Sequence, residues 1–426
     1  KAARNGRRVL VIEKRPRAGG TCGVFERKGY RFPMGPLSFG FPRKVQALLE
    51  EAGVSGAIGF APSRFRLLAP GLDIVYSRPL AAVRKDLAAV FPREAAGIEK
   101  FFEEFEAVIG SVRDIHDWHP DYSPGRRPEK ADERASPELA RRMDQIKEWA
   151  SSPAAGPIGR HLSSPALKNF LGSMGTHEAE MSILNLALMW RLMSEVGIWF
   201  PSGGIHGLAE RLRAGFLASG GELRLSTAVK KIVVEKGRAA GVLTATDEFF
   251  PCRWVVSNAD FKRTILDFLD PAEVPAGFLE SVRAVPYTDS EFCAYLGIDP
   301  RKVDLRRLSA GHVFFRKEIR PISGTPLEDF DNREIEVCFW SRKAAGLAPP
   351  GKASIVLRVG FPYEHFSEWK TGEKMRRPGY GEYKKQMAAQ LIRTVDSLLP
   401  GLSSAVEVLE TATPLTYEDW GNRFRG

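Results

Sequence analysis

The chain has 426 residues, of which 43% are hydrophobic and 27% are charged, so it can bury the cores of more than one domain and is not intrinsically disordered. Its apolar runs are too short to cross a bilayer. The net charge of +10 favours anionic partners, but no nucleic-acid-binding motif accompanies it, and the four cysteines lack the spacing of a disulfide framework or a zinc site.

The first 20 residues predict one edge of a nucleotide-binding sheet. Residues 1–6 read as the last turn of a helix that Gly6 ends, and RRVLVIE at 7–13 reads as a buried strand of a parallel sheet. The strand ends in a lone acid, Glu13, before the basic segment KRPRAGG at 14–20. In dinucleotide-binding βαβ units such an acid, about 20 residues after a glycine-rich loop, accepts both hydroxyls of the adenosine ribose. An ordinary strand followed by a charged loop explains the same residues.

Hairpins and amphipathic helices follow. We expect hairpins about Lys28-Gly29 and Pro70-Gly71. The spacing of apolar residues predicts helices over 42–53, 93–115, 166–175 and 181–197. The charge-dense segment 123–148 reads as an exposed insertion that is helical in its second half.

The second half of the chain reads as two further groups of strands. Residues 200–260 predict a helix, a break at Gly220-Gly221 and then strands, the last of which is RWVVSNA at 253–259. Alternating segments then predict a second sheet, with strands at 292–299, 311–317, 334–341 and 354–362. We expect an amphipathic helix over 383–402, a strand from residue 406 and an open loop at the end.

Isolated polar residues give weaker signals. His116 and His119, in DIHDWHP, suggest a metal pair, but a polar loop before Pro120 is the commoner explanation, so we predict no metal site. His177 and Arg191 are candidates to face a substrate, although a satisfied polar residue at a helix end is again commoner. No catalytic residue is assigned.

Four segments, in this order and spacing, resemble the phytoene desaturase, carotenoid isomerase and retinol saturase group of FAD-dependent oxidoreductases, which are related to the amine oxidases. The segments are VLVIEKRPRAGGTCGVFERKGYRFPMGP at 9–36, WFPSGGIHGLAERLRAGFLASGGELRLSTAVKKI at 199–232, AAGVLTATDEFFPCRWVVSNAD at 239–260 and ATPLTYEDWGN at 412–422. Each motif alone is moderate evidence, whereas the order of all four is strong.

The resemblance implies a set of cofactor-binding residues. Glu13 is expected to bind the ribose, and Val229 to contact the adenine through its backbone. The residues expected to line the ribose and pyrophosphate are Arg15, Gly19, Gly20 and Thr21. The residues expected nearer the flavin are Gly35, Pro36 and Ser257-Asn258-Ala259.

The resemblance also implies a mixed α/β fold, in which a Rossmann-like FAD-binding domain joins a substrate domain of mixed sheet plus helices. The FAD-binding domain is expected in three parts, at 1–60, 199–285 and 406–426. The substrate domain is expected as a largely helical part at 61–198 and a sheet with a helix at 286–405. The family's GxGxxG loop and its C-terminal FAD motif are absent, so we expect a truncated fragment, and the sequence does not decide whether this fragment binds FAD.

The implied function is that of an FAD-dependent oxidoreductase. Its substrate would be a long apolar polyene or isoprenoid, whose carbon–carbon bonds are desaturated, saturated or isomerised by hydride transfer to or from flavin. The Met-, Leu- and Trp-rich helices between 166 and 200 would then wall a substrate tunnel, or they are plain core. A cytoplasmic location with reversible contact to an anionic membrane surface fits the basic charge. An amine-oxidase-type enzyme and a flavin-free descendant that binds lipid or a partner protein are the alternatives.

Overall fold

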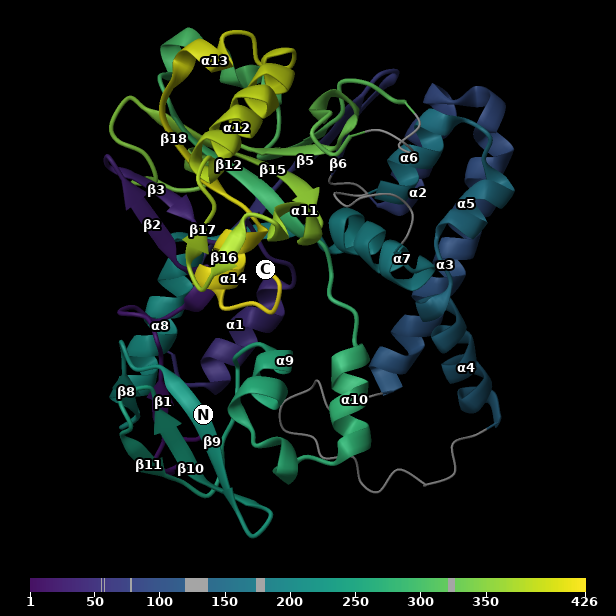
Figure 1. The fold of residues 1–426 in the computed structure, drawn as a ribbon. Coiled ribbons are helices and arrows are strands. Elements are labelled where there is room, and N and C mark those ends of the chain that lie inside the picture. The colour runs from purple at the N-terminus through teal and green to yellow at the C-terminus, as the bar shows by residue number, and fades with distance from the viewer. Residues whose placement is uncertain (55, 57, 77–78, 119–136, 174–180, 321–325) are drawn as a thin grey trace.

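The computed structural model describes all residues except 55, 57, 77–78, 119–136, 174–180 and 321–325. Figure 1 shows three regions: a large sheet with α12 and α13 at the top, a small group of strands around β1 and β8–β11 below it, and a bundle of helices to one side. The predicted mixed α/β fold is confirmed, whereas the predicted domain boundaries stay a prediction.

The small group of strands includes the N-terminal strand. β1 (Leu10–Ile12) pairs in parallel with β8 (Glu222–Arg224), and the helix α8 (Gly204–Ala218) leads into β8. Next to this pair, β9 (Val229–Glu235), β10 (Arg238–Thr244) and β11 (Phe249–Pro251) form an antiparallel sheet. The predicted parallel strand is therefore confirmed.

Two details of this region differ from the prediction. The strand β1 is not fully buried, because β8 is its one partner among the described strands and Val11 remains 42% exposed. The segment 253–259 is not a strand, and its Trp254 and Val256 are 87% and 95% exposed. A strand needs a neighbour for its backbone N–H and C=O groups, and no described strand lies in register beside this segment.

The large sheet has seven strands in the order β18-β12-β15-β14-β13-β5-β6, and only β13 and β5 run parallel to each other. Its strands are β5 (Phe65–Ala69), β6 (Leu72–Tyr76), β12 (Ser290–Ile298), β13 (His312–Phe315), β14 (Ile335–Cys338), β15 (Ala353–Phe361) and β18 (Val406–Ala412). The second predicted sheet and the hairpin about Pro70-Gly71 are confirmed. The helix α12 (Tyr380–Asp396) covers one face, burying Met387, Leu391 and Val395.

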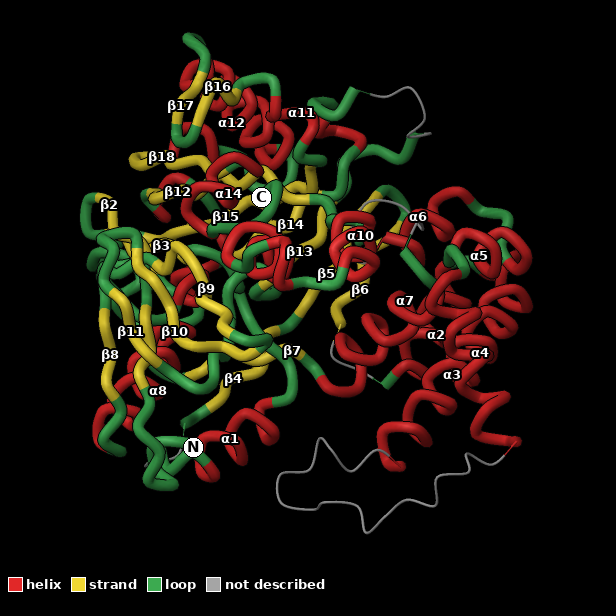
Figure 2. The backbone as a smooth tube through the Cα atoms, turned by 60° about the horizontal axis from the view of Figure 1, so that its bottom comes forward, coloured by secondary structure: helices red, strands yellow, loops and turns green. Residues whose placement is uncertain are grey.

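Two different units cover the other face of this sheet. A bundle of helices packs on Phe65, Leu67 and Phe314 at the β5 and β13 side. The hairpin of β2 (Val24–Arg27) and β3 (Tyr30–Pro33) packs on Tyr295 of β12. In Figure 2 the bundle lies apart from the strands of the N-terminal region. The seam between the two units therefore crosses the middle of the sheet.

The helical bundle contains the predicted apolar helices. Its members are α2 (Leu80–Val90), α3 (Ala95–Trp118), α4 (Pro137–Ser151), α5 (Ala155–His161), α6 (Pro165–Ser173) and α7 (Ile183–Arg191). In α7 the side chains of Ile183, Leu186 and Trp190 are fully buried in the bundle's core. These side chains act as core in this structure.

The other elements are short connections and caps. They are α1 (Pro42–Glu51), α9 (Phe261–Arg263), α10 (Ala276–Ala284), α11 (Glu364–Ser367), α13 (Leu402–Ala405), β4 (Phe60–Ser63), β7 (Ile198–Pro201), β16 (Lys370–Gly372) and β17 (Met375–Arg376). The predicted open loop at the end is wrong, because α14 (Pro414–Gly421) forms there. Thr413 and Thr416 cap it reciprocally, which satisfies two free backbone groups of its first turn. None of the described helices combines the length and apolarity of a membrane span.

Candidate functional site

The segment after β1 continues beside the exit of β8. The Glu13 N–H donates to the Arg224 carbonyl (2.8 Å), and the Glu13 carbonyl accepts from the Thr227 N–H (2.9 Å). Val229 begins β9 two residues later. The half-buried Glu13 carboxylate accepts the Arg15 N–H on Oε1 (2.8 Å), and Oε2 has no hydrogen-bond partner among the described residues. Glu13, Arg15 and Val229 therefore lie at one edge, and the free oxygen suits a hydroxyl donor.

The glycine pair lies against α8. Gly19 and Gly20 have φ of +110° and +53°, backbone conformations that glycine adopts without strain. A Cβ on Gly19 would lie 2.8 Å from the Cβ of Ala209 in α8, and one on Gly35 would lie 3.0 Å from Thr21. The loop thus packs closely against α8 on one side and against Gly35 on the other, and glycine backbone of this kind lets N–H groups approach a phosphate.

Cations gather around this loop. Lys14 donates from Nζ to Asn422 Oδ1 (3.1 Å), and burial together with repulsion from Lys374, Arg263 and Arg15 lowers the pKa of its ammonium group. Burial also lowers the pKa of Arg15. The Arg263 Nε is buried without a hydrogen-bond partner among the described residues. Neighbouring cations that repel one another, with a buried donor unused, fit an anion such as a pyrophosphate.

The C-terminal helix α14 closes the loop from the other side. The Arg15 guanidinium lies over the Trp420 ring, 5.6 Å from its centre, a cation–π contact. A Cβ on Gly421 would lie 4.0 Å from Thr21 Cγ2. One turn earlier, Tyr417 Oη lies 3.0 Å from Cys293 Sγ in β12. The helix α14 therefore connects the glycine loop to the large sheet.

A row of polar side chains crosses the large sheet, and it begins at Cys293, the residue that Tyr417 contacts. His312 Nδ1 lies 2.6 Å from Glu336 Oε1, and Arg358 Nη1 donates to Glu336 Oε2 (2.9 Å). Arg358 Nε donates to Glu291 Oε2 (2.8 Å), and Glu291 lies two residues before Cys293 on β12. We call His312, Glu336, Arg358, Glu291 and Cys293 the polar row.

Sequence reasoning missed the polar row. Its signal was present, because Glu291 and Cys293, and likewise Glu336 and Cys338, occupy alternate positions of otherwise apolar strands and so share one face. Burial alone would raise the pKa of Glu336, but Arg358 and His312 hold it at about 2. Glu336 is therefore ionised at neutral pH, and its partners are Arg358 and His312.

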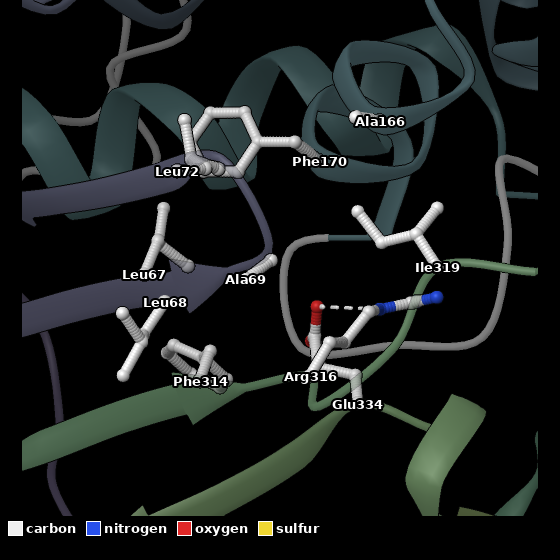
Figure 3. A pocket seen from close by; sticks show the side chains of 10 residues that line it. All are labelled: Leu67, Leu68, Ala69, Leu72, Ala166, Phe170, Phe314, Arg316, Ile319 and Glu334. Atoms are coloured by element: carbon white, nitrogen blue, oxygen red, sulfur yellow. Dashed lines mark ion pairs between the residues drawn. The ribbon is translucent and has the colours of Figure 1, made fainter. Parts of the chain in front are cut away.

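A cavity lies between the sheet and the helical bundle (Figure 3). Its walls are mostly apolar, with Leu67, Leu72 and Phe170 facing one another, and Arg316 and Glu334 pair across one side with Nε and Oε2 3.8 Å apart. Its volume of about 20 Å³ holds one water molecule. It is too small for a cofactor or a long substrate in this structure.

The remaining residues that the sequence singles out are not shown to lie at the loop at 13–21 or in the polar row. The backbone of His116 lies in α3 rather than in a loop, while His119 and His177 lie outside the described residues. Arg191 is the last residue of α7. Pro36 is exposed, and Ser257-Asn258-Ala259 belong to the exposed irregular segment before α9.

Three comparisons place the chain among known proteins. Residues 3–392 match the family model described as flavin containing amine oxidoreductase. The chain is 26% identical to prolycopene isomerase of Daucus carota, over 99% of this chain and 68% of that protein. It is 24% identical to the zeta-carotene-forming phytoene desaturase of Myxococcus xanthus, over 99% and 78%.

Solved structures share the fold. A putrescine oxidase variant matches with a TM-score of 0.62 and 15% identity, over 99% of this chain and 83% of that one. An oxidoreductase from Methanosarcina mazei matches with a TM-score of 0.59 and 15% identity, over 97% and 84%. At this identity the likeness concerns the fold alone.

Proposed function

Because the chain belongs to the family of flavin-containing amine oxidoreductases, we propose that it oxidises, reduces or isomerises carbon–carbon bonds of a long apolar isoprenoid. The prediction of an FAD-dependent oxidoreductase is confirmed by this membership. The choice of substrate class rests on the named relatives, a prolycopene isomerase and a phytoene desaturase, which match nearly the whole chain.

The proposed binding of FAD rests on the arrangement of the loop at 13–21. The Glu13 carboxylate would accept the ribose hydroxyls, and the backbone of Gly19, Gly20 and Thr21 would face the pyrophosphate. Arg15 would neutralise phosphate charge, and the Val229 backbone would meet the adenine. These residue roles are part of the proposal.

The bound flavin supplies the capacity to accept or donate a hydride. The protein's own contribution is orientation and exclusion of water. The hairpin β2–β3 and the helical bundle bury apolar side chains on both sides of the seam across the sheet, so a substrate held at that seam would be shielded from water.

The test is anaerobic flavin reduction in the purified holoprotein. We expect phytoene or another polyene to change the flavin absorbance, and putrescine to leave it unchanged. Reduction by the amine alone would favour the amine-oxidase alternative. The variant Glu13→Ala should lose FAD, whereas Glu222→Ala, an exposed acid on β8, should retain it and serves as the control.

Reversible contact with an anionic membrane is a further part of the proposal. The net charge of +10 supports it, because anionic lipid attracts basic proteins. In a flotation assay the protein should bind phosphatidylserine vesicles at low salt and release at high salt. Absence of binding at low salt would contradict this part alone.

A further inference from the structure

The polar row is unexpected in a protein whose proposed substrate is largely a hydrocarbon. Arg358 and Glu291 lie on β15 and β12, both interior strands of the seven-stranded sheet. Glu336 lies directly opposite Arg358 in the register of β14 and β15, and Cys293 lies opposite Arg358 on the other side. Charged residues in the middle of a sheet are costly unless they are paired, so the row needs a reason.

The Arg358 guanidinium is held by two carboxylates, but they do not occupy all of its N–H donors. Glu291 accepts from its Nε and Nη2, and Glu336 accepts from its Nη1. A guanidinium has five N–H groups, so one N–H on each of Nη1 and Nη2 has no partner among the described residues. The side chain keeps 28% of its surface exposed, although it stands on an interior strand. Arg358 is therefore fixed in position with two donors available.

The helix α14 connects these donors to the cofactor loop. Tyr417 contacts Cys293 at the end of the row, and one turn later Gly421 approaches Thr21. The polar row and the proposed flavin site are thus joined by a single short helix.

The polar row carries two carboxylates, Glu291 and Glu336, and one guanidinium, Arg358. The ammonium group of Lys343, which lies outside the row, attracts Glu336. Burial lowers the pKa of His312, so its imidazole is neutral. Two carboxylates beside one guanidinium repel a carboxylate ligand, so the row favours a neutral oxygen over a carboxylate.

We propose that Arg358 is a specificity-determining residue that donates to a hydroxyl or carbonyl oxygen of an otherwise apolar substrate. This inference rests on the proposed function and narrows its substrate to an oxygenated isoprenoid. Glu291 and Glu336 act as positioning residues, because they hold the guanidinium in place.

The experiment measures dissociation constants of the holoprotein from shifts of the flavin absorbance. The four ligands share one carbon skeleton: geranylgeraniol, geranylgeranial, geranylgeranoic acid and the hydrocarbon without the oxygen function. We expect the alcohol and aldehyde to bind at least about tenfold more tightly than the hydrocarbon, the range of a hydrogen bond to a charged donor. In Arg358→Met this preference should disappear while the hydrocarbon binds as before. Arg306→Met, which removes a 92% exposed guanidinium, is the control and should keep the preference.

The outcomes separate the two proposals. If none of the four ligands binds, the proposed substrate class is wrong and the inference falls with it. If the hydrocarbon binds as tightly as the alcohol, the inference is wrong and the proposed function stands. Should Arg358→Met fail to fold, the variant Glu291→Gln tests the inference instead. Because it removes one negative charge beside Arg358, the ratio of the dissociation constants for geranylgeranoic acid and geranylgeraniol should shift in favour of the acid by about tenfold. An unchanged ratio would refute the role of Arg358.

Discussion

Replacing Gly19 with alanine puts a methyl group 2.8 Å from the Cβ of Ala209, at a φ of +110°. Two costs add at this position. The backbone conformation costs about 1–3 kcal/mol for a residue with a Cβ, and the overpacked contact costs about 1–3 kcal/mol more. We therefore expect Gly19→Ala to destabilise the protein by about 2–6 kcal/mol.

Gly20 provides a matched control. Its φ is +53° and nothing lies within 4 Å of an added Cβ. Gly20→Ala should therefore cost only the left-handed backbone conformation, about 1–2 kcal/mol. The difference between the two variants measures the contact with α8 rather than backbone strain.

Unfolding in urea, followed by circular dichroism, gives the free energies. The double variant Gly19→Ala with Ala209→Gly removes the clash, so it should be more stable than the sum of the single variants by at least about 1 kcal/mol. Flavin fluorescence should show that Gly19→Ala also weakens FAD binding more than Gly20→Ala. Equal costs for the two glycine variants, with no coupling to Ala209, would refute the close approach of the loop to α8.

Three further predictions concern single side chains. Arg358 and His312 lower the pKa of Glu336 to about 2 against the effect of burial, so its stabilising contribution is present above about pH 4.5 and is lost towards pH 2. The difference in unfolding free energy between wild type and Glu336→Gln, measured in urea, should therefore shrink as the pH falls over that range. A constant difference would contradict the pairing. Trp190→Ala, which empties a fully buried site, should cost about 3–5 kcal/mol, and a change below about 1 kcal/mol in thermal unfolding would exclude this packing. Glu13→Gln should weaken FAD binding about tenfold without altering the unfolding temperature of the apoprotein, and unchanged fluorescence titrations would remove Glu13 from the site.

Local turn chemistry made parts of the fold predictable. The hairpin about Lys28-Gly29 forms because both residues take positive φ, at 48° and 81°, which such two-residue turns require. The helix α1 ends at Glu51, and Gly53 follows its C-cap with φ of +75°, the glycine stop that the sequence predicts. These features depend on neighbouring residues alone, so the sequence was sufficient.

Features that depend on distant segments were less predictable. RWVVSNA at 253–259 has the apolar pattern of a strand, but a strand also needs a partner, and the described chain supplies none there. The polar row depends on the registers that set Glu336 and Cys293 on either side of Arg358. A shift of one residue in either register would have turned those side chains to the opposite face.

The prediction of a loop in place of α14 left two long-range contacts unpredicted, those with Arg15 and Cys293. Thr413 before Pro414 is a helix-start signal, yet the segment was expected to be a loop. As a helix it points Tyr417 towards Cys293 and brings Trp420 under Arg15, contacts that a loop would not fix together. The loop at 13–21 and the polar row consequently both contact this one short helix, through Trp420 and Tyr417. Any change that loosens α14, such as loss of its Thr413 cap, therefore disturbs both the proposed flavin site and the proposed substrate contact.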